Sequence, residues 1–311
     1  MDKAYDIAVV IINYNNAQYT IDCINSICKN TSPELSIQYI IIDNASGSED
    51  LEKLQKFART TNIPHLTLFP GRINTGFGGG NMLGVQFANA KYYAFINNDT
   101  LLLDDCLKIC YEFMESNAEA GVCGPHIKIE EKGQAGSFDH FISLTKLLLG
   151  NAFLETAGIK PRRKISYPNP IKVDYVNGSF MFFRASDFEN SGGFDTNIFL
   201  FYEESDLCKR LKKEKKFCYY IPQAKYLHFE GKSQGTSIRK KIELKLSMLY
   251  VLRKHEGHLV YLIAKGFLIL KYSLSVVIKP GYLPLLKVLL KGTHLSDSLK
   301  QDQKILENRW T

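Results

Sequence analysis

The sequence lacks the cysteine and glycine motifs that mark several large classes of protein. Its seven cysteines are odd in number and form no C-x-x-C pair, which argues against a zinc ribbon and a disulfide scaffold. We therefore expect reduced, buried thiols, as in a cytoplasmic protein. The glycine-rich segment NTGFGGGNM has neither G-x-G-x-x-G spacing nor the GK[ST] ending of a P-loop, so it is not a standard dinucleotide or P-loop fingerprint.

The chain also shows little that suggests export or disorder. The opening residues MDKAYD have neither the basic nor the apolar region of a signal peptide, so we expect no secretory signal. Of the 311 residues, 45% are apolar and 23% are charged, which is typical of a globular protein and excludes a fibrous or disordered one. A chain of this length can bury a sizeable core in one or two domains.

Apolar runs alternate with amphipathic segments through the first part of the chain. We expect strands at 7–12, 37–42, 65–69 and 92–96, and helices at 17–29, 49–61, 80–90 and 104–117. This alternation predicts an α/β fold whose mostly parallel sheet is covered by helices on both faces. Residues 126–172 are expected to form an irregular, lid-like insertion. A strand at 173–184, a helix at 202–215 and strands at 217–221 and 224–229 are expected to follow it.

Polar residues follow each of the first four predicted strands, where ligands of such sheets bind. These residues are Asn13, Asn15, Asp43, Asn44, Arg72, Asn74, Gly76, Asn97, Asn98 and Asp99. A turn or a helix cap would explain any one of them alone. Together they line one edge of the sheet. Asp43 suits ribose hydroxyls or a base N–H, the backbone at Gly76 can approach an anion, and Asp99 suits Mg²⁺ or Mn²⁺ against a diphosphate.

A second polar cluster lies in the segment FYEESD. At helical spacing Glu203 and Asp206 share one face, with Glu204 beside them. Crowded carboxylates raise one another's pKa, and a cleft carboxylate can act as a general base. A helix start that simply favours acids is the alternative. His228, at the end of the predicted strand AKYLHF, is a possible metal ligand, although a lone histidine is more often structural.

The positive charge of the chain belongs to its C-terminal part. Residues 232–311 contain 15 Lys and Arg against 5 Asp and Glu, within a total net charge of +7. Lysines interrupt the apolar pattern of 236–291 at short intervals, so we expect no spanning helix. A basic face opposite apolar residues suits an anionic membrane surface, and an ordinary helical subdomain with solvated lysines is the alternative. The tail has no basic–aromatic stacking pattern, so we expect no nucleic-acid partner.

Taken in order, the motifs resemble family 2 inverting glycosyltransferases with a GT-A fold, in the rhamnosyltransferase-like branch of bacterial surface-polysaccharide synthesis. The resemblance covers about residues 5–235. The motifs that carry it are VVIINYNN, IIIDNAS, NTGFGGGNM, FINNDT, VNGSFMFFR, GGFDTNIFLFYEESDLCKRL and HFEGKS. It implies a catalytic domain at 1–235, with a nucleotide-binding half at about 1–125 and an acceptor half at about 170–235. A basic, amphipathic helical extension at 236–311 follows.

The resemblance also implies roles for individual residues. Asn13, Asn15, Asp43, Asn44, Arg72, Asn74, Gly76, Asn97 and Asn98 would bind the nucleotide and diphosphate, Asp99 and His228 would hold Mg²⁺ or Mn²⁺, and Gly178 and Ser179 would face the acceptor. The family's Glu-Asp pair, whose second member is the usual base, is Glu203-Glu204 here. The base is therefore Glu204, Glu203 or Asp206. Asn97 also replaces the first Asp of the family's D-x-D motif, so metal dependence could be weaker.

The function implied is transfer of a sugar, with inversion, from a dTDP- or UDP-sugar such as dTDP-rhamnose to a glycan or lipid-linked acceptor. The enzyme would work in the cytoplasm, at the inner face of the cytoplasmic membrane, and a homo-oligomer is possible. A catalytically degenerate relative that only binds nucleotide sugars is one alternative. A sugar-nucleotide pyrophosphorylase is another, but its glycine-rich signature should follow the first strand, which here ends in NYNN.

Overall fold

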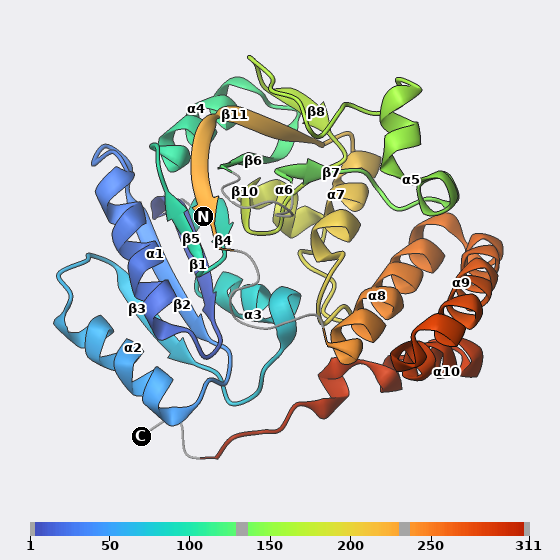
Figure 1. The fold of residues 1–311 in the computed structure, drawn as a ribbon. Coiled ribbons are helices and arrows are strands. Elements are labelled where there is room, and N and C mark those ends of the chain that lie inside the picture. Colours follow the sequence, from blue (N-terminus) through green and yellow to red (C-terminus); the bar gives the residue numbers. More distant parts are fainter. Residues whose placement is uncertain (1–3, 129–135, 230–236, 308–311) are drawn as a thin grey trace.

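The computed structural model describes residues 4–128, 136–229 and 237–307. Strands and helices alternate through the first part of the chain (Figure 1). In order they are β1 (Tyr5–Asn13), α1 (Ala17–Asn30), β2 (Ile37–Asp43), α2 (Ser48–Thr60), β3 (Leu66–Pro70), α3 (Gly76–Val85), β4 (Ala90–Ile96), β5 (Thr100–Leu102), α4 (Cys106–Ser116) and β6 (Ala120–Lys128).

The second part holds shorter strands and then helices alone. It comprises β7 (Phe138–Asp139), α5 (Leu144–Thr156), β8 (Ile171–Val173), β9 (Tyr175–Val176), β10 (Phe180–Arg184), α6 (Ala185–Asn190), α7 (Glu203–Lys213), β11 (Phe217–His228), α8 (Ile238–Glu256), α9 (His258–Ile278) and α10 (Leu283–Lys291). Short 3₁₀ turns at Pro280–Tyr282, Leu295–Asp297 and Leu299–Asp302 connect or follow the last helices.

The main sheet has the strand order β3-β2-β1-β4-β10-β6-β11-β5, with β8 paired to β11. β1 runs parallel to β2 and β4, and β2 runs parallel to β3. β10 is antiparallel to both of its neighbours, β4 and β6. The predicted α/β fold with a mostly parallel sheet is therefore confirmed. Because Asn13 pairs with Asp43, the polar ends of β1 and β2 lie side by side.

Alternate residues of β1 enter two separate cores. Ile7, Val9 and Ile11 pack in one buried cluster, whereas Ala8 and Val10 pack in another on the opposite face. A strand covered on both faces needs apolar residues at every position, which explains the uninterrupted apolar run in the sequence. Figure 1 shows α1 and α2 on one side of this sheet and α3 on the other.

Several predicted elements differ from the structure. α3 begins at Gly76 rather than at 80, because its glycines form the first helical turn. The expected strand at 173–184 is divided into the end of β8, β9 and β10, and the two expected strands at 217–229 are one irregular strand, β11. The stretch predicted as irregular, 126–172, contains the helix α5, kinked at Gly150. The expected domain boundary at 235 lies outside the described residues, as does most of HFEGKS.

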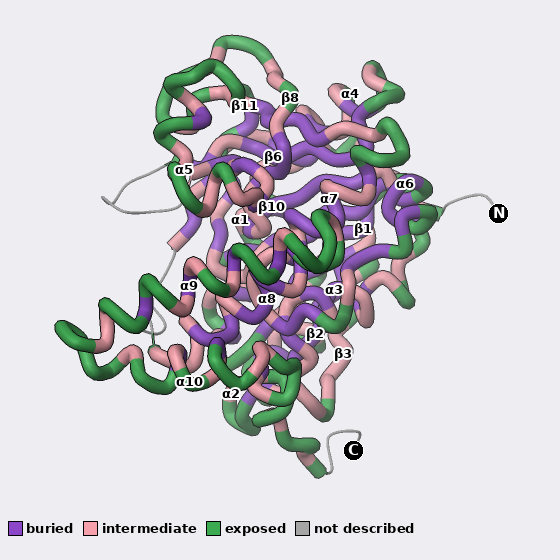
Figure 2. The backbone as a smooth tube through the Cα atoms, turned by 90° about the vertical axis from the view of Figure 1, so that its right-hand side faces the viewer, coloured by how far each residue is buried: buried purple, intermediate pink, exposed green. Residues whose placement is uncertain are grey.

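The C-terminal helices α8, α9 and α10 form a third apolar cluster beside the sheet domain. Figure 2 shows α9 and α10 projecting from the body with many exposed turns. Within the described residues, α9 alone is long and apolar enough to cross a membrane by length and composition, and 22% of its apolar window is buried. The sequence predicts no spanning helix because lysines interrupt the apolar pattern, and α9 meets this length and composition criterion although it contains two lysines.

The first turn of α3 is fixed against the segment that precedes α7. The N–H of Phe77 donates to the carbonyl oxygen of Phe199 over 3.0 Å. Gly76 has a φ of +76°, and a Cβ there would overlap the same Phe199 carbonyl. Only glycine permits both the left-handed backbone and this close approach. The contact joins the two halves of the sheet domain.

We therefore expect Gly76→Ala to destabilise the protein more than Gly192→Ala. Gly192 has a similar φ of +77°, but a Cβ there would meet nothing within 4 Å, so its cost is backbone strain of about 1–2 kcal/mol. At Gly76 a clash worth about 1–3 kcal/mol is added. Urea unfolding of both variants measures the difference. Equal losses of unfolding free energy would contradict the steric role of Phe199.

Candidate functional site

The ends of β1 and β2 are joined by a buried polar cluster. The side-chain amide of Asn13 lies 3.0 Å from Asp43 Oδ1, 3.0 Å from Ser46 Oγ and 2.7 Å from Asp50 Oδ2. Asp43 is fully buried, and its second carboxylate oxygen accepts from the Ser46 N–H over 3.1 Å. Asp43 thus stabilises the edge of the sheet through buried hydrogen bonds. The sequence had suggested that it contacts a base or ribose directly.

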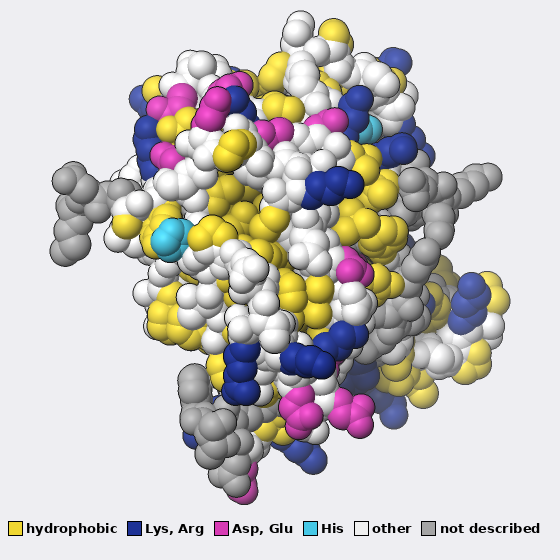
Figure 3. Space-filling view, turned by 90° about the vertical axis from the view of Figure 1, so that its left-hand side faces the viewer, with side chains coloured by type: hydrophobic (Ala, Val, Ile, Leu, Met, Phe, Trp, Pro, Cys, Tyr) yellow, Lys and Arg dark blue, Asp and Glu magenta, His cyan; other side chains and the backbone are white. Residues whose placement is uncertain are grey.

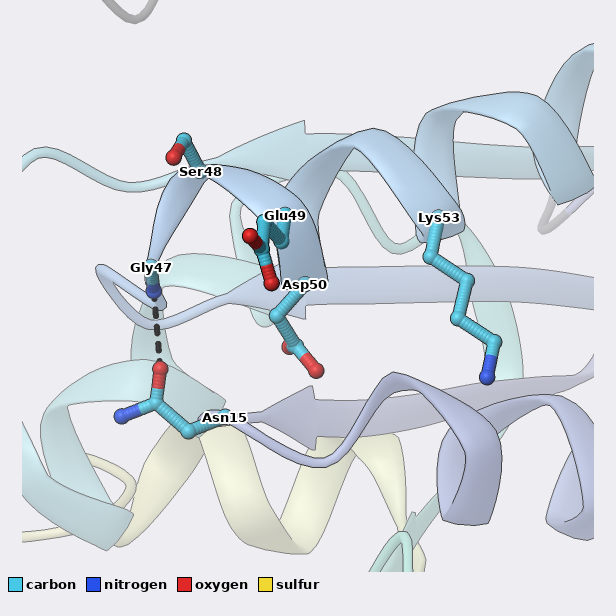
Figure 4. Close-up of a pocket in the computed structure, with 6 residues that line it drawn as sticks. All are labelled: Asn15, Gly47, Ser48, Glu49, Asp50 and Lys53. Atoms are coloured by element: carbon cyan, nitrogen blue, oxygen red, sulfur yellow. Dashed lines mark hydrogen bonds between the residues drawn. The ribbon is translucent and has the colours of Figure 1, made fainter.

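Asn15 lies at the mouth of a pocket beside this cluster. The pocket has a volume of about 580 Å³ and is lined by Asn15, Gly47, Ser48, Glu49, Asp50 and Lys53. The Asn15 carboxamide oxygen accepts from the Gly47 N–H over 2.8 Å, as Figure 4 shows. Of the residues predicted to bind the donor, Asn15 is the one that lines this pocket.

Asn44 connects the end of β2 to the start of α3. Its Nδ2 donates to Asn74 Oδ1 over 2.9 Å and to the Gly76 carbonyl over 3.1 Å, while its Oδ1 accepts from the Thr75 N–H over 3.0 Å. Asn44, Asn74 and Gly76 are therefore brought together as the sequence predicted. These hydrogen bonds hold the N-terminus of α3 at the edge of the sheet, and the N–H groups of Thr75 and Gly76 are occupied by Asn44 Oδ1 and Asn74 Oδ1.

Arg72 is occupied by the far end of the chain. Its Nε donates to the Leu306 carbonyl over 3.2 Å, and its own carbonyl accepts from the Leu306 N–H over 2.7 Å. Arg72 lies on the surface directly after β3, and Figure 1 shows the C-terminal segment crossing beneath the molecule to reach it. The structure therefore gives a predicted donor-binding residue a partner that the sequence did not suggest.

The end of β4 brings Asp99 against His228 of β11. Asp99 Oδ1 lies 3.2 Å from His228 Nε2, across the antiparallel pairing of β5 and β11. His228 is mostly buried, whereas the Asp99 side chain is 23% exposed and open to solvent. A carboxylate beside an imidazole is a suitable pair of ligands for Mg²⁺ or Mn²⁺. Among the described residues no group of three or more His, Cys, Asp or Glu could hold a metal.

Asn97 and Asn98 form hydrogen bonds with different parts of the sheet domain. The N–H of Asn97 donates to the Ser179 carbonyl over 2.9 Å. The side chain of Asn98 reaches Thr20 Oγ1 over 3.1 Å and Asn13 Oδ1 over 3.4 Å. The motif that carries Asp99 is thus tied to β1 on one side and to the start of β10 on the other.

The loop between β9 and β10 lies against Glu204. A Cβ on Gly178 would be 3.8 Å from the Glu204 carboxyl carbon, so the glycine leaves the carboxylate room. Ser179 is buried, and its hydroxyl is 2.7 Å from the Tyr226 hydroxyl. Gly178 is therefore next to the candidate base, as the sequence predicted for the acceptor side, while Ser179 points into the core.

These contacts form a closed circuit, which we call the ring. It runs from Asn98 to Asn13, through the Asn44 N–H that donates to the Asn13 carbonyl over 2.8 Å, and on through Asn44 to Gly76. From Gly76 and Phe77 it continues to Phe199, follows the chain from Phe199 to Glu204, and passes Gly178 and Ser179 to reach Asn97. The ring gathers residues from six regions of the sequence around one side of the sheet.

Glu203 and Glu204 differ in their surroundings although they are neighbours. Glu203 is buried, and its Oε1 has no hydrogen-bond partner. Desolvation and the adjacent Glu204 raise the pKa of Glu203 well above its usual value. Glu204 is partly exposed, and loss of hydration, with Asp139 opposing Lys146, raises its pKa to about 7. Of the two, Glu204 can exchange protons with a ligand at neutral pH.

Asp206 belongs to a buried ion cluster that joins α7 to α8. Its Oδ1 lies 2.7 Å from His255 Nε2 and 2.8 Å from Lys254 Nζ, and its Oδ2 accepts from Arg210 Nε over 2.9 Å. Burial acts to raise the pKa of Asp206, but the hydrogen bond from His255 and the charges of Arg210 and Lys254 outweigh it and lower the pKa to about 2. A carboxylate so engaged acts as an anchor.

Some residues of the site gave no signal in the sequence. Asp50 accepts from the Ala17 N–H over 2.7 Å and so fixes the start of α1, and the sequence did not single it out. Lys146 Nζ lies 2.9 Å from Asp139 Oδ2, and this pair acts electrostatically on Glu204. Lys146 and Asp139 lie in the stretch that was predicted to be irregular, 126–172. Their approach to α7 depends on tertiary packing.

Comparison with known proteins agrees with this arrangement. The family described as Glycosyl transferase family 2 matches residues 8–192, and the chain belongs to that family. The rhamnosyltransferase WbbL of Escherichia coli (strain K12) is 28% identical over 192 residues, covering 58% of this chain and 71% of that protein. An N-acetylglucosaminyl-diphospho-decaprenol L-rhamnosyltransferase of Mycobacterium tuberculosis is 30% identical over 92 residues, 29% of this chain and 30% of that protein.

The fold also matches solved glycosyltransferases. A crystal structure of GalNAc-T7 with UDP, GalNAc and Mn²⁺ superposes with a TM-score of 0.64 at 12% identity, over 93% of this chain and 56% of that one. At this identity the likeness concerns the fold, and it identifies the α/β sheet domain as a GT-A fold. The protein is thus a glycosyltransferase with helices appended to a GT-A domain.

The surroundings of Asp206 lead to a stability prediction. Asp206→Asn should lower the unfolding free energy at pH 7 by about 3–5 kcal/mol, because it removes the charge of a buried carboxylate that pairs with Arg210 and Lys254. A carboxyl whose folded pKa is about 2 stabilises the fold above the unfolded value of about 4 and loses that contribution as pH falls toward 2. The deficit should therefore shrink between pH 4 and 2 in urea unfolding. Glu52→Gln, at an exposed acid on α2, is the control and should change little; similar losses in both variants would refute the anchor.

Proposed function

We propose that this glycosyltransferase transfers a sugar from a nucleotide-diphosphate donor to a glycan or lipid-linked acceptor, with inversion, in bacterial surface-polysaccharide synthesis. The donor would be a dTDP- or UDP-sugar, with dTDP-rhamnose favoured by the rhamnosyltransferase names of two relatives. The observation that carries the proposal is the ring, which connects Glu204 and the motif that contains Asp99 to the polar ends of β1 and β2.

Glu204 is the residue we propose as the base. It lies at the first turn of α7, it is partly exposed, and its pKa of about 7 suits proton transfer near neutral pH. In the reaction the acceptor oxygen bonds to the anomeric carbon as the bond from that carbon to the diphosphate breaks. The acceptor proton passes to the Glu204 carboxylate and the nucleoside diphosphate leaves. Attack opposite the leaving group inverts the anomeric centre.

Asp99 and His228 are the residues we propose as metal ligands. Two protein ligands leave room for oxygens of the donor diphosphate, and a divalent ion held there would offset the negative charge of the leaving group. GalNAc-T7, which shares the fold, was crystallised with Mn²⁺ and UDP. Asn97 lies in this motif with its backbone committed to Ser179. Its amide would contribute less charge to a metal site than a carboxylate.

The donor would lie along the ends of β1, β2 and β4. Asn15, Asn44, Asn74 and Asn98 lie there, held in place by hydrogen bonds within the protein. The buried Asp43 would act by holding Asn13 and Ser46 in place. We extend the proposal to a cytoplasmic location at the inner face of the membrane, with the C-terminal helices facing the lipid.

The two neighbouring glutamates give a matched test of the base. Glu204→Gln should reduce transfer by about 10²-fold or more while nucleotide binding survives, because the amide cannot accept the acceptor proton. Glu203→Gln should retain most of the activity, since Glu203 is buried and packs against Gly78 of α3. Transfer is measured by release of nucleoside diphosphate from a panel of dTDP- and UDP-sugars. Near-normal transfer by Glu204→Gln would remove Glu204 from the role.

The pH profile should also follow Glu204. A base must be deprotonated to act, so kcat/KM should rise with pH through about 7 and then level off. This dependence is measured in the wild-type enzyme with a fixed donor, and the Glu203→Gln variant should keep it. A kcat/KM that stays constant from pH 5.5 to 8 would contradict the assignment, because Glu204 should change its protonation state within this range of about 2.5 pH units.

A thermal-shift panel of UDP, dTDP, GDP and CDP, with and without Mn²⁺ or Mg²⁺, tests the donor and the metal together. A nucleotide at 100 times its Kd should stabilise the protein by about 2.7 kcal/mol. Asp99→Asn should remove the part of the shift that depends on metal, whereas Asp104→Asn, at a nearby acid outside the ring, should leave it intact. No shift with any nucleotide from folded protein would contradict the donor proposal.

A further inference from the structure

Helix α9 is apolar on two opposite faces. Its buried face packs into the C-terminal cluster through Tyr261, Ala264, Leu268 and Tyr272. Its outer face carries Leu259, Ile263, Leu270, Leu274 and Val277, spaced three, four or seven residues apart, and Val277 is 83% exposed. At this spacing the outer residues form a continuous stripe along the helix. A helix that only covered a soluble core would present polar residues there.

The charges beside this stripe are all positive. Between Glu256 and Asp297 the sequence contains five lysines and no Asp or Glu. Lys271, Lys279, Lys287 and Lys291 are exposed around α9 and α10. By contrast, the side of the molecule that bears α1 and α2 carries both acidic and basic side chains (Figure 3). Apolar side chains bordered by lysines complement an anionic lipid surface.

A second segment extends the same surface. Helix α5 exposes Leu148, Leu149 and Phe153, and the loop after it exposes Ile159 and Ile165. This loop also carries the exposed cations Arg162 and Lys164. α5 contacts α9, and Figures 1 and 2 both place α5 next to the C-terminal helices. Two regions about 100 residues apart in the sequence thus present the same combination of apolar and basic side chains.

The inner side of α5 leads to the candidate base. Leu144 and Leu147 pack in the C-terminal cluster with Tyr202, the residue directly before Glu203. Lys146 pairs with Asp139, whose other oxygen is 3.1 Å from Asn151 Nδ2, and this pair acts on Glu204. Helix α5 thus exposes apolar side chains and also carries Lys146, whose pair with Asp139 acts on the candidate base.

We propose that α5 with its following loop and α9 with α10 form one docking face for an anionic bilayer. The face would present Glu204 to an acceptor that is itself held in the lipid. This inference rests on the proposed function for the role of Glu204, and it selects a lipid-anchored acceptor over a soluble glycan. A second copy of the chain is a poorer occupant, because two lysine-bordered faces without acids would repel each other.

Co-sedimentation with vesicles tests the docking face. Wild-type protein should bind phosphatidylcholine vesicles that contain phosphatidylglycerol, bind pure phosphatidylcholine less, and lose affinity in high salt. Leu274→Glu and Leu149→Glu should each weaken binding about tenfold or more, since lipid burial of a leucine is worth at least that factor. Leu103→Glu, at an exposed leucine after β5, should bind as the wild type does. All four proteins should unfold at similar temperatures, because these leucines are 38–65% exposed.

Each other outcome overturns the proposal. An effect of Leu274→Glu without one of Leu149→Glu would limit the face to α9. A wild-type dimer that Leu274→Glu converts to monomer would make the stripe an interface between copies. Resistance of vesicle-bound protein to alkaline extraction would mean that α9 spans the bilayer. Nucleotide thermal shifts report on the proposed function separately: a protein that binds vesicles but no nucleotide keeps the docking face and loses the donor assignment.

Discussion

The close approach of Gly76 to the carbonyl of Phe199 is the contact on which the site depends. It joins the first turn of α3, which follows the nucleotide-side strands, to the segment that leads into α7. Phe201 and Tyr202 then adopt left-handed backbone with φ of 73° and 72°, so the chain turns sharply just before Glu203. Left-handed non-glycine residues cost free energy, and packing must hold them. The position of the candidate base is therefore set by packing between the two halves.

This arrangement explains why two adjacent glutamates have different chemistry. The sharp turn directs Glu203 toward the α3 glycines, where a Cβ on Gly78 would be 3.5 Å from its Cγ. Glu204 is directed toward Gly178, on the side that we propose for the acceptor. One carboxyl is thereby buried while the next retains access to solvent.

Much of this structure was predictable from the sequence, and the remainder depends on contacts between distant residues. The run VVIIN predicts a strand buried on both faces, and β1 is one. The polar residues at the strand ends meet at one edge because parallel strands end together. The burial of Asp43, the ion cluster of Asp206 and the pairing of Arg72 with Leu306 could not be predicted. Each depends on a partner 30 to 234 residues away in the sequence, which no local pattern specifies.

The two-sided apolar character of α9 has a consequence for how its sequence can vary among relatives. In an ordinary surface helix the buried positions vary little and the outer ones vary freely, which gives conservation a period of about 3.6 residues. In α9 both Leu268, packed inside, and Leu270, facing out, require apolar side chains. Selection for apolar side chains would then act on nearly the whole circumference of the helix. The 3.6-residue period in conservation would then come from the lysines that border the stripe. Substitutions at the other positions of this helix would exchange one apolar residue for another.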